Sequence, residues 1–249
     1  MIKKTLLLLV LFQPVFVFAQ TSGGQIKRST KSSSTSMTKR AVLPSKKGKI
    51  PIKAVDLGLP SGTLWADRNL GANTPEEYGS YFAWGEIHSK STYSESNYKL
   101  RWKEKYHLSS EDMNVNRKYE LDKNDDAAFV IWGQKWRIPT NEQFNELTDS
   151  RYTKIEWVDY HSVKGLRISS LSNNNFIFLP ASGLMLDDSP LNDSEWGHYW
   201  SRSLLDNDSN MAYNLSISQL LIENNLIGKR ESMSRRFYGL SIRPVFTPN

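Results

Sequence analysis

Glycine and proline recur every few residues between Val55 and Glu86, in the run VDLGLPSGTLWADRNLGANTPEEYGSYFAWGE. Short apolar pieces lie between them, and the run has neither a helical period nor low complexity. Gly and Pro punctuate secondary structure more strongly than other residues, so this pattern is typical of turns that connect short strands. A chain with this run is therefore expected to fold as a globular domain rich in turns.

The first residues have the pattern of an export signal. Two lysines precede the apolar stretch Thr5–Phe18, and Val17-Phe18-Ala19 resembles a cleavage site. The stretch falls short of the ~20 residues that a membrane span needs. We expect residues 1–19 to be a signal peptide that is cleaved after Ala19, which leaves no transmembrane segment. The chain would then be secreted, periplasmic or part of the outer cell envelope.

Charge separates the following segment from the rest of the chain. The formal net charge is +6, but residues 21–50 hold eight basic residues and no acid or aromatic residue. Such a Ser/Thr-rich segment cannot bury enough apolar surface to offset chain entropy, which predicts a disordered basic linker over residues 20–50. It serves either as a solvated spacer or as an attachment to an anionic envelope surface. Residues 51–249 have 22 basic and 26 acidic residues (22 − 26 = −4), which argues against a nucleic-acid partner.

The chain has no cysteine, and all eight tryptophans follow Ile52. An exported protein without disulfides must be stabilised by its core, and a domain of about 200 residues buries roughly 70% of its unfolded surface. We expect residues 51–249 to form a single α+β domain with two short helices and a small antiparallel sheet.

Local patterns place the elements of this domain. Helices are expected at residues 125–132 and 141–148, the second begun by Thr140 and Gln143 at the spacing of a capping box. A hairpin is expected to turn at residues 162–164, and the continuous apolar run at 176–179 indicates a strand buried on both faces. The strands are expected at residues 63–66, 80–84, 156–160, 165–169, 176–179, 198–202, 212–217 and 240–245.

Nine strings occur in the order of one known family: VDLGLPSGTLWA, NLGA, EEYGSYFAWGE, DDAA, WGQKWRIPT, FLPASG, YWSRS, AYNL and RRFYGLSIRPV. On these strings the chain resembles the Fibrobacter succinogenes major paralogous domain family over about residues 55–245. The resemblance implies a C-type lectin-like fold with long loops, distantly similar to formylglycine-generating sulfatase-modifying enzymes. Asp67 and Arg68 stand where relatives have a Thr-Cys pair, which removes any cysteine-dependent role.

No catalytic constellation is visible in the sequence, so a non-enzymatic role is expected. The formylglycine-generating enzymes need copper-binding cysteines, which this chain lacks. Its four histidines have no metal-binding spacing, and no G-x-S-x-G elbow occurs. Glu76, Glu77 and Glu86 could act as paired carboxylates in a hydrolase, or serve as surface and capping groups.

No cofactor is expected, with calcium as the alternative. Acids at alternate positions of the segment Asp122–Asp126 resemble the opening of a calcium loop, but the glycine and the distant glutamate of an EF-hand are absent. Because the same acids precede a predicted helix, capping is the simpler interpretation.

Aromatic residues divide into two groups. Those in the family strings are expected to build the core, together with arginines that pair with carboxylates; the structural residues are Trp65, Trp84, Trp132, Trp136, Arg137 and Arg243, and Arg236 is expected to pair similarly. Aromatic residues in segments less tied to the strings are candidates for a ligand surface, since Trp and Tyr stack on sugars and anchor interfaces. These are Trp102, Tyr106, Trp157, Tyr160, Trp196 and Tyr199.

These observations favour an exported, non-catalytic binding or adhesion module of the bacterial cell envelope. Its partner would be a glycan or an envelope protein. A secreted carboxylate-dependent hydrolase and a self-assembling structural envelope component remain the alternatives.

Overall fold

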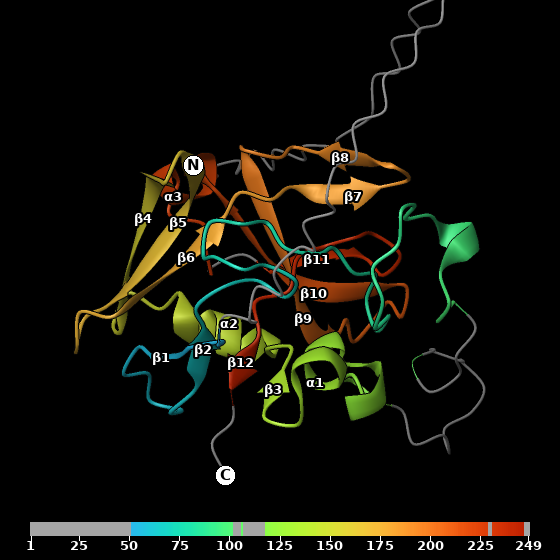
Figure 1. Ribbon diagram of the computed structural model, residues 1–249, viewed down its shortest axis with the longest axis horizontal. Helices are drawn as coiled ribbons and strands as arrows, with labels where there is room; N and C mark the ends of the chain where they lie inside the picture. The colour runs from blue at the N-terminus through green and yellow to red at the C-terminus, as the bar shows by residue number, and fades with distance from the viewer. Residues whose placement is uncertain (1–50, 102–105, 107–117, 229–230, 247–249) are drawn as a thin grey trace, which may run out of the picture. The chain divides into compact units, whose positions relative to one another are not determined.

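The computed structural model describes residues 51–101, 106, 118–228 and 231–246. The chain divides into two units, Met1–Lys47 and Gly48–Asn249. The signal peptide and linker predicted for residues 1–50 lie outside the described residues. The second unit consists mostly of antiparallel β-sheets with a few short helices (Figure 1).

A four-stranded antiparallel sheet joins the two ends of the domain to its middle. It contains β1 (Ala54–Asp56), β2 (Leu64–Ala66), β12 (Val245–Phe246) and β3 (Trp136–Arg137), in that order. Val245 pairs with Trp65 on one side and with Arg137 on the other. The last strand of the chain therefore lies between two much earlier ones.

A second antiparallel sheet has the order β4-β5-β6. Its strands are β4 (Thr153–Tyr160), β5 (Val163–Ser170) and β6 (Phe176–Pro180). The β4–β5 hairpin turns at His161 and Ser162, whose φ angles are 52° and 66°. Two successive left-handed residues are typical of a type I′ turn, whose twist matches that of the flanking strands. The turn lies one residue earlier than the predicted 162–164.

The third sheet, of order β11-β10-β9, contains β9 (Trp196–Leu204), β10 (Met211–Ser218) and β11 (Ser232–Arg235). Successive side chains of a strand point to opposite faces. In β10, Leu215 and Ile217 join the hydrophobic core, whereas Asn214 and Ser216 alternate with them. A separate hairpin is made by β7 (Leu184–Leu186) and β8 (Ser189–Leu191).

The helices are short and are begun by side-chain caps. Asp126 accepts a hydrogen bond from Phe129 N at the start of α1 (Ala127–Trp132). Thr140 and Gln143 form the predicted capping box of α2 (Asn141–Leu147). Ser218 caps α3 (Gln219–Glu223), which the sequence patterns missed. Two 3₁₀ turns, Glu95–Asn97 and Lys123–Asp125, complete the helical elements among the described residues.

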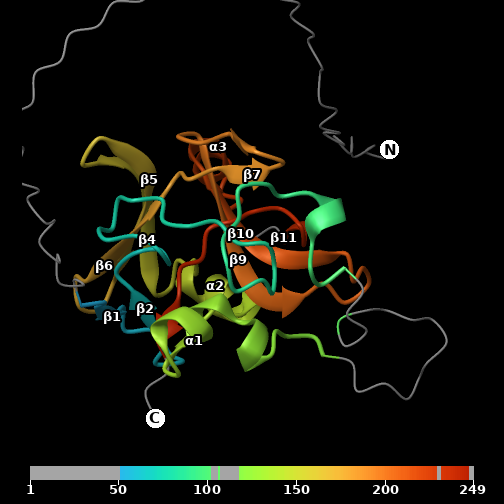
Figure 2. The ribbon, with the colours of Figure 1, turned by 45° about the vertical axis from the view of Figure 1, so that its right-hand side comes forward.

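Two hydrophobic clusters fill the domain. The first contains Trp84, Tyr93 and Trp200, and the second contains Trp65, Phe144 and Tyr199, with further apolar residues around each. The β4–β5–β6 sheet and the β9–β10–β11 sheet lie side by side, with α1 and α2 along one side and β7 on the opposite side (Figures 1 and 2).

The described residues form mostly antiparallel β-sheets with a few helices, which is consistent with the expected α+β class but differs from it in detail. The described residues contain three α-helices instead of two, and four small sheets instead of one. Residues 80–84 form no strand but only a bridge from Phe82 to Leu240, because turns at Gly79 and Gly85 leave this segment too short to pair further. Of the strand expected at 240–245, only Val245 lies in a strand, β12.

Candidate functional site

A cleft of about 350 Å³ lies between α2, the segment from α3 to β11, and the strands β10 and β11. We call it the α2–β10 cleft. Its volume falls in the range of small-molecule sites, roughly 300–1,000 Å³. The residues that line it are Asn141, Phe144, Asn145, Trp196, Asn214, Leu215, Ser216, Leu221, Leu226, Gly228, Glu231, Ser232 and Met233.

The lining combines one indole with apolar, amide and hydroxyl groups. Trp196 is half-buried and its ring lies parallel to that of His198, with centroids 6.2 Å apart. Glu231 is the single ionisable side chain among the described lining residues, and it is exposed. The described part of the lining therefore offers one apolar face and several hydroxyl or amide groups to a ligand.

A hydrogen-bonded ladder fixes the polar groups of this wall. Asn214 Oδ1 accepts from Ser216 Oγ at 3.0 Å and from Ser232 Oγ at 2.8 Å, and Asn214 Nδ2 donates to Ser234 Oγ at 2.8 Å. His198 Nδ1 lies 2.8 Å from Ser216 Oγ. If Ser216 gives its single proton to Asn214, His198 donates from Nδ1–H. Burial lowers the pKa of His198 to about 4, so this ring is neutral at pH 7.

A second cavity of about 720 Å³ adjoins the α2–β10 cleft. Asn145 and Gly228 line both, so the two share a wall near the end of α2. The second cavity continues toward β4, where Thr153, Lys154 and Ile155 line it. Together they form an extended concave surface along α2.

The five predicted ligand residues that the structure describes do not meet at one site. Trp196 lines the α2–β10 cleft, and Trp102 lies outside the described residues. Trp157 and Tyr160 lie on opposite faces of β4: Trp157 packs on the second core cluster, whereas Tyr160 contacts Phe178 with ring centroids 5.0 Å apart. Both are half-buried.

Tyr106 and Tyr199 were predicted on the surface but are core residues. Both side chains are 0% exposed. The Tyr106 hydroxyl donates to Asp125 Oδ2 at 2.8 Å, and the Tyr199 hydroxyl donates to Pro180 O at 2.5 Å. Each ring fills the interior while its hydroxyl finds an internal acceptor, which leaves neither available to a surface ligand.

The residues predicted to be structural lie in the core or pack against it. Trp65, Trp84 and Trp136 are buried, and half-buried Trp132 packs edge-on against Trp136. Arg243 is fully buried, but instead of pairing with a carboxylate it donates to Asn69 Oδ1, Ala66 O and Phe178 O. Uncharged oxygens from loops and strands already satisfy its donors.

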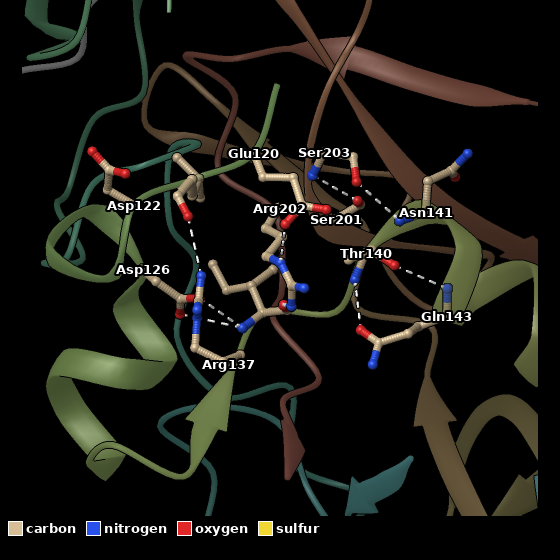
Figure 3. Close-up of polar contacts among 12 residues, drawn as sticks. Glu120, Asp122, Asp126, Arg137, Thr140, Asn141, Gln143, Ser201, Arg202 and Ser203 are labelled. Carbon is tan, nitrogen blue, oxygen red and sulfur yellow. Dashed lines mark hydrogen bonds and ion pairs between the residues drawn. The ribbon is translucent and has the colours of Figure 1, made fainter. Parts of the chain in front are cut away.

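Arg137 forms the predicted ion pair, at the centre of the network in Figure 3. Its Nε lies 2.7 Å from Asp126 Oδ2, and its Nη2 donates to Leu121 O. Asp126 also accepts from Ile138 N, so one buried carboxylate caps α1 and holds β3. Arg202 pairs with Glu120 and donates to Ile138 O. This network stabilises the fold of the domain.

The acidic residues of the segment Asp122–Asp126 cap a helix and hold neighbouring loops. Asp122 pairs with Lys118, Asp125 accepts from Tyr106, and Asp126 caps α1. No group of three or more potential ligands that could hold a metal ion occurs in the part of the chain that the structure describes. Here the capping interpretation has direct geometric support.

The three glutamates of the hydrolase alternative have separate partners. Glu86 is buried and accepts from Lys90 and from Lys99 N, and Glu77 accepts from Asn73 N. Glu76 lies 3.5 Å from His161 Nδ1. None of these contacts links one glutamate to another, so each has a local, loop-holding role.

The sequence patterns missed the polar residues of the cleft. Asn214 and Ser216 alternate with Leu215 and Ile217 in the string AYNLSIS, which is the signal that could have identified them as one face of a strand. The contributions of α2 and of Glu231 depend on tertiary packing, which no local pattern reports.

No family model, curated protein or solved structure matches this chain. Among the described residues, no helix is long and apolar enough to cross a membrane.

Proposed function

We propose that this chain is an exported, non-catalytic binding module of the bacterial cell envelope, which recognises a glycan at the α2–β10 cleft. The composition of the cleft is the observation that supports this most directly. A half-buried indole offers a flat apolar surface, and Asn141, Asn145 and Ser232 add amide and hydroxyl groups to the same lining. Sugars present an apolar ring face and many hydroxyls, so they match such a lining.

The adjoining cavity favours an oligosaccharide over a single sugar. It shares Asn145 and Gly228 with the cleft and continues along α2. A ligand that occupied both cavities would extend over at least two sugar units. Asp149 and Lys154 also line the second cavity, and each is already paired with a neighbouring residue, Arg151 and Glu156 respectively.

The sequence supports the same proposal from a different direction. The predicted signal peptide supports a location outside the cytoplasm, and the resemblance to the Fibrobacter succinogenes major paralogous domain family suggests a C-type lectin-like fold. We propose that fold for residues 51–249, with the short antiparallel sheets as its frame and the cleft as its variable part.

A glycan array tests the proposal. The mature chain, residues 20–249, is labelled and applied to bacterial envelope and host oligosaccharides, and hits are measured by calorimetry. We expect binding to selected oligosaccharides that weakens at least tenfold in Trp196→Ala, because the stacking surface is lost, and weakens in Asn145→Ala.

Trp132→Ala is the matched control, because it removes a half-buried indole that does not line the cleft. It should bind as the unmodified chain does, with circular dichroism used to verify that all variants fold. Absence of any hit on the array, together with capture of an envelope protein that Trp196→Ala does not affect, would contradict the glycan proposal.

The two alternatives make different predictions. A hydrolase would release sugars from a polysaccharide, and Glu86→Gln would abolish that release. A self-assembling component would show concentration-dependent oligomers in light scattering of the mature chain. The separate engagement of the three glutamates argues against the first alternative.

A further inference from the structure

β4 is a long edge strand. It is an outer strand of the β4–β5–β6 sheet and lies on the left of the domain in Figure 1. All eight of its residues pair with β5 without a bulge, and none of them is a proline. An edge strand presents unpaired N–H and C=O groups, and short length, bulges and prolines are common means of preventing another chain from pairing with it. β4 has none of these three protections.

The other outer strands are shorter or already covered. β1, β3, β7, β8 and β11 have two to four residues each, and β8 contains Pro190. At the opposite edge of the β4 sheet, β6 is mostly buried and Arg243 donates to Phe178 O. On β9, Leu204 N donates to Tyr119 O. Among the described residues, β4 is therefore the edge best suited to accept a further strand.

The backbone groups of Ile155, Trp157 and Asp159 point away from β5. The β4–β5 turn makes Tyr160 and Val163 a hydrogen-bonded pair, and such pairs alternate with non-hydrogen-bonded pairs along an antiparallel ladder. Every second residue counted back from Tyr160 therefore bonds to β5, and the residues between them direct N–H and C=O outward. In the described structure these outward groups have no hydrogen-bond partner.

Lys154 and Glu156 give this edge a charge pattern that is complementary to itself. Their side chains are 62% and 41% exposed, and Lys154 Nζ lies 2.7 Å from Glu156 Oε1. The core cluster and α3 lie on the other face of β4, with Ile155 and Trp157. The exposed face therefore has one positive and one negative side chain at successive positions.

Two β4 strands that pair antiparallel bring these charges together in one register. With a twofold axis at Ile155, Lys154 of each copy lies opposite Glu156 of the other. An axis at Glu156 would place the two glutamates opposite each other, and an axis at Trp157 would place each charge opposite an uncharged residue. Opposite charges across two strands stabilise a sheet and like charges destabilise it, so the axis at Ile155 is favoured.

We propose that β4 pairs antiparallel with β4 of a second copy of this chain, about a twofold axis at Ile155, so that the two three-stranded sheets become one. A twofold interface uses the same surface of both copies, so the assembly ends at the dimer, unlike an open-ended structural component. Thr153, Lys154 and Ile155 also line the second cavity. The second cavities of the two copies therefore adjoin the interface.

Sedimentation equilibrium of the mature chain tests the proposal. The mass should rise with concentration from one copy to two and then stop. Lys154→Glu and Glu156→Lys each change both cross-strand pairs from opposite to like charges, so each variant should weaken dimerisation roughly tenfold or more. A mass of one copy at every concentration, growth beyond two copies, or unchanged dimerisation in both variants would overturn the proposal.

A mixture of these two variants is the matched control. In a mixed dimer, a Lys154→Glu copy carries two acids and a Glu156→Lys copy carries two lysines, so both cross-strand pairs again have opposite charges. The mixture should dimerise as the unmodified chain does, although neither variant does so alone. Failure of the mixture to dimerise would overturn the pairing of Lys154 with Glu156 across the axis.

Hydrogen exchange gives a test that needs no variant. The amides of Ile155 and Trp157 point outward and are expected to exchange more slowly at concentrations where the dimer prevails, because the second β4 accepts hydrogen bonds from them. Equal exchange rates of these amides in monomer and dimer would place the interface elsewhere and overturn the proposal.

Discussion

Single buried side chains hold distant loops together in this domain, and Arg243 connects three segments. Its donors reach Asn69, Ala66 and Phe178, which belong to the opening glycine-rich run and to β6. Burial lowers the pKa of Arg243 to about 10, so the side chain remains charged at pH 7. In Arg243→Met three acceptors lose their donor, and we expect the free energy of unfolding to fall by roughly 3 kcal/mol or more.

Urea unfolding monitored by tryptophan fluorescence measures this loss. Arg151→Met is the control, since that guanidinium lies at the surface, where it pairs with Asp149 and lies over the Tyr152 ring. Its midpoint should equal that of the unmodified chain. Equal midpoints for both variants would mean that Arg243 contributes no more than a surface arginine does.

His198 makes the free energy of unfolding depend on pH in acidic solution. Burial lowers its folded pKa to about 4, below the usual value of about 6.5. Above pH 6.5 the ring is neutral in both states and the effect is absent. Between pH 6.5 and 4 the unfolded chain takes up a proton that the folded chain does not, so the free energy of unfolding falls, by up to about 3 kcal/mol.

The measurement compares urea midpoints at pH 7.5 and 4.5 for the unmodified chain and for His198→Gln. Carboxylates titrate in both chains, so the difference between the two pH dependences isolates His198. The variant should lose less stability on acidification. The same slope in both chains would show that the ring titrates normally in the fold.

At the scale of elements, the capping box that begins α2 also positions the cleft. Thr140 and Gln143 exchange hydrogen bonds (Figure 3). The helix that they start supplies Asn141, Phe144 and Asn145 to the wall of the cleft. Thr140→Ala should lower the free energy of unfolding by about 1 kcal/mol, while Thr140→Ser retains the hydroxyl and most of that stability. Thermal unfolding of both variants separates them, and an equal loss would exclude the cap as the cause.

A substitution in the β4–β5 turn is expected to stabilise the domain. Ser162 has a φ of 66°, a conformation that costs a non-glycine residue about 1–2 kcal/mol. Ser162→Gly removes this strain but loosens the unfolded chain, so we expect a net gain of about 0.5 kcal/mol. Ser162→Ala keeps the strain and should give no gain. Differential scanning calorimetry detects the change, and a lower Tm for the glycine variant would contradict the turn assignment.

Local sequence patterns predicted the elements that have a local signal, such as a helix cap, a turn or an apolar run. Thr140 with Gln143 predicted α2, and the continuous run at 176–179 predicted β6. The same patterns placed Tyr106 and Tyr199 on the surface, because burial of a tyrosine depends on which distant oxygen its hydroxyl meets. The cleft itself was not predicted, since its walls come from α2, β10 and β11, which only the tertiary fold assembles.

At the scale of the whole molecule, order along the chain and order in space differ. β12 is the final strand, yet it pairs with both β2 and β3. A chain that emerges from a ribosome, or crosses a membrane in extended form, leaves β2 without this neighbour until Phe246 has arrived. Contacts so distant in sequence also slow folding. Such a domain cannot complete its four-stranded sheet until its last residues are free, which is compatible with the export that we propose for this chain.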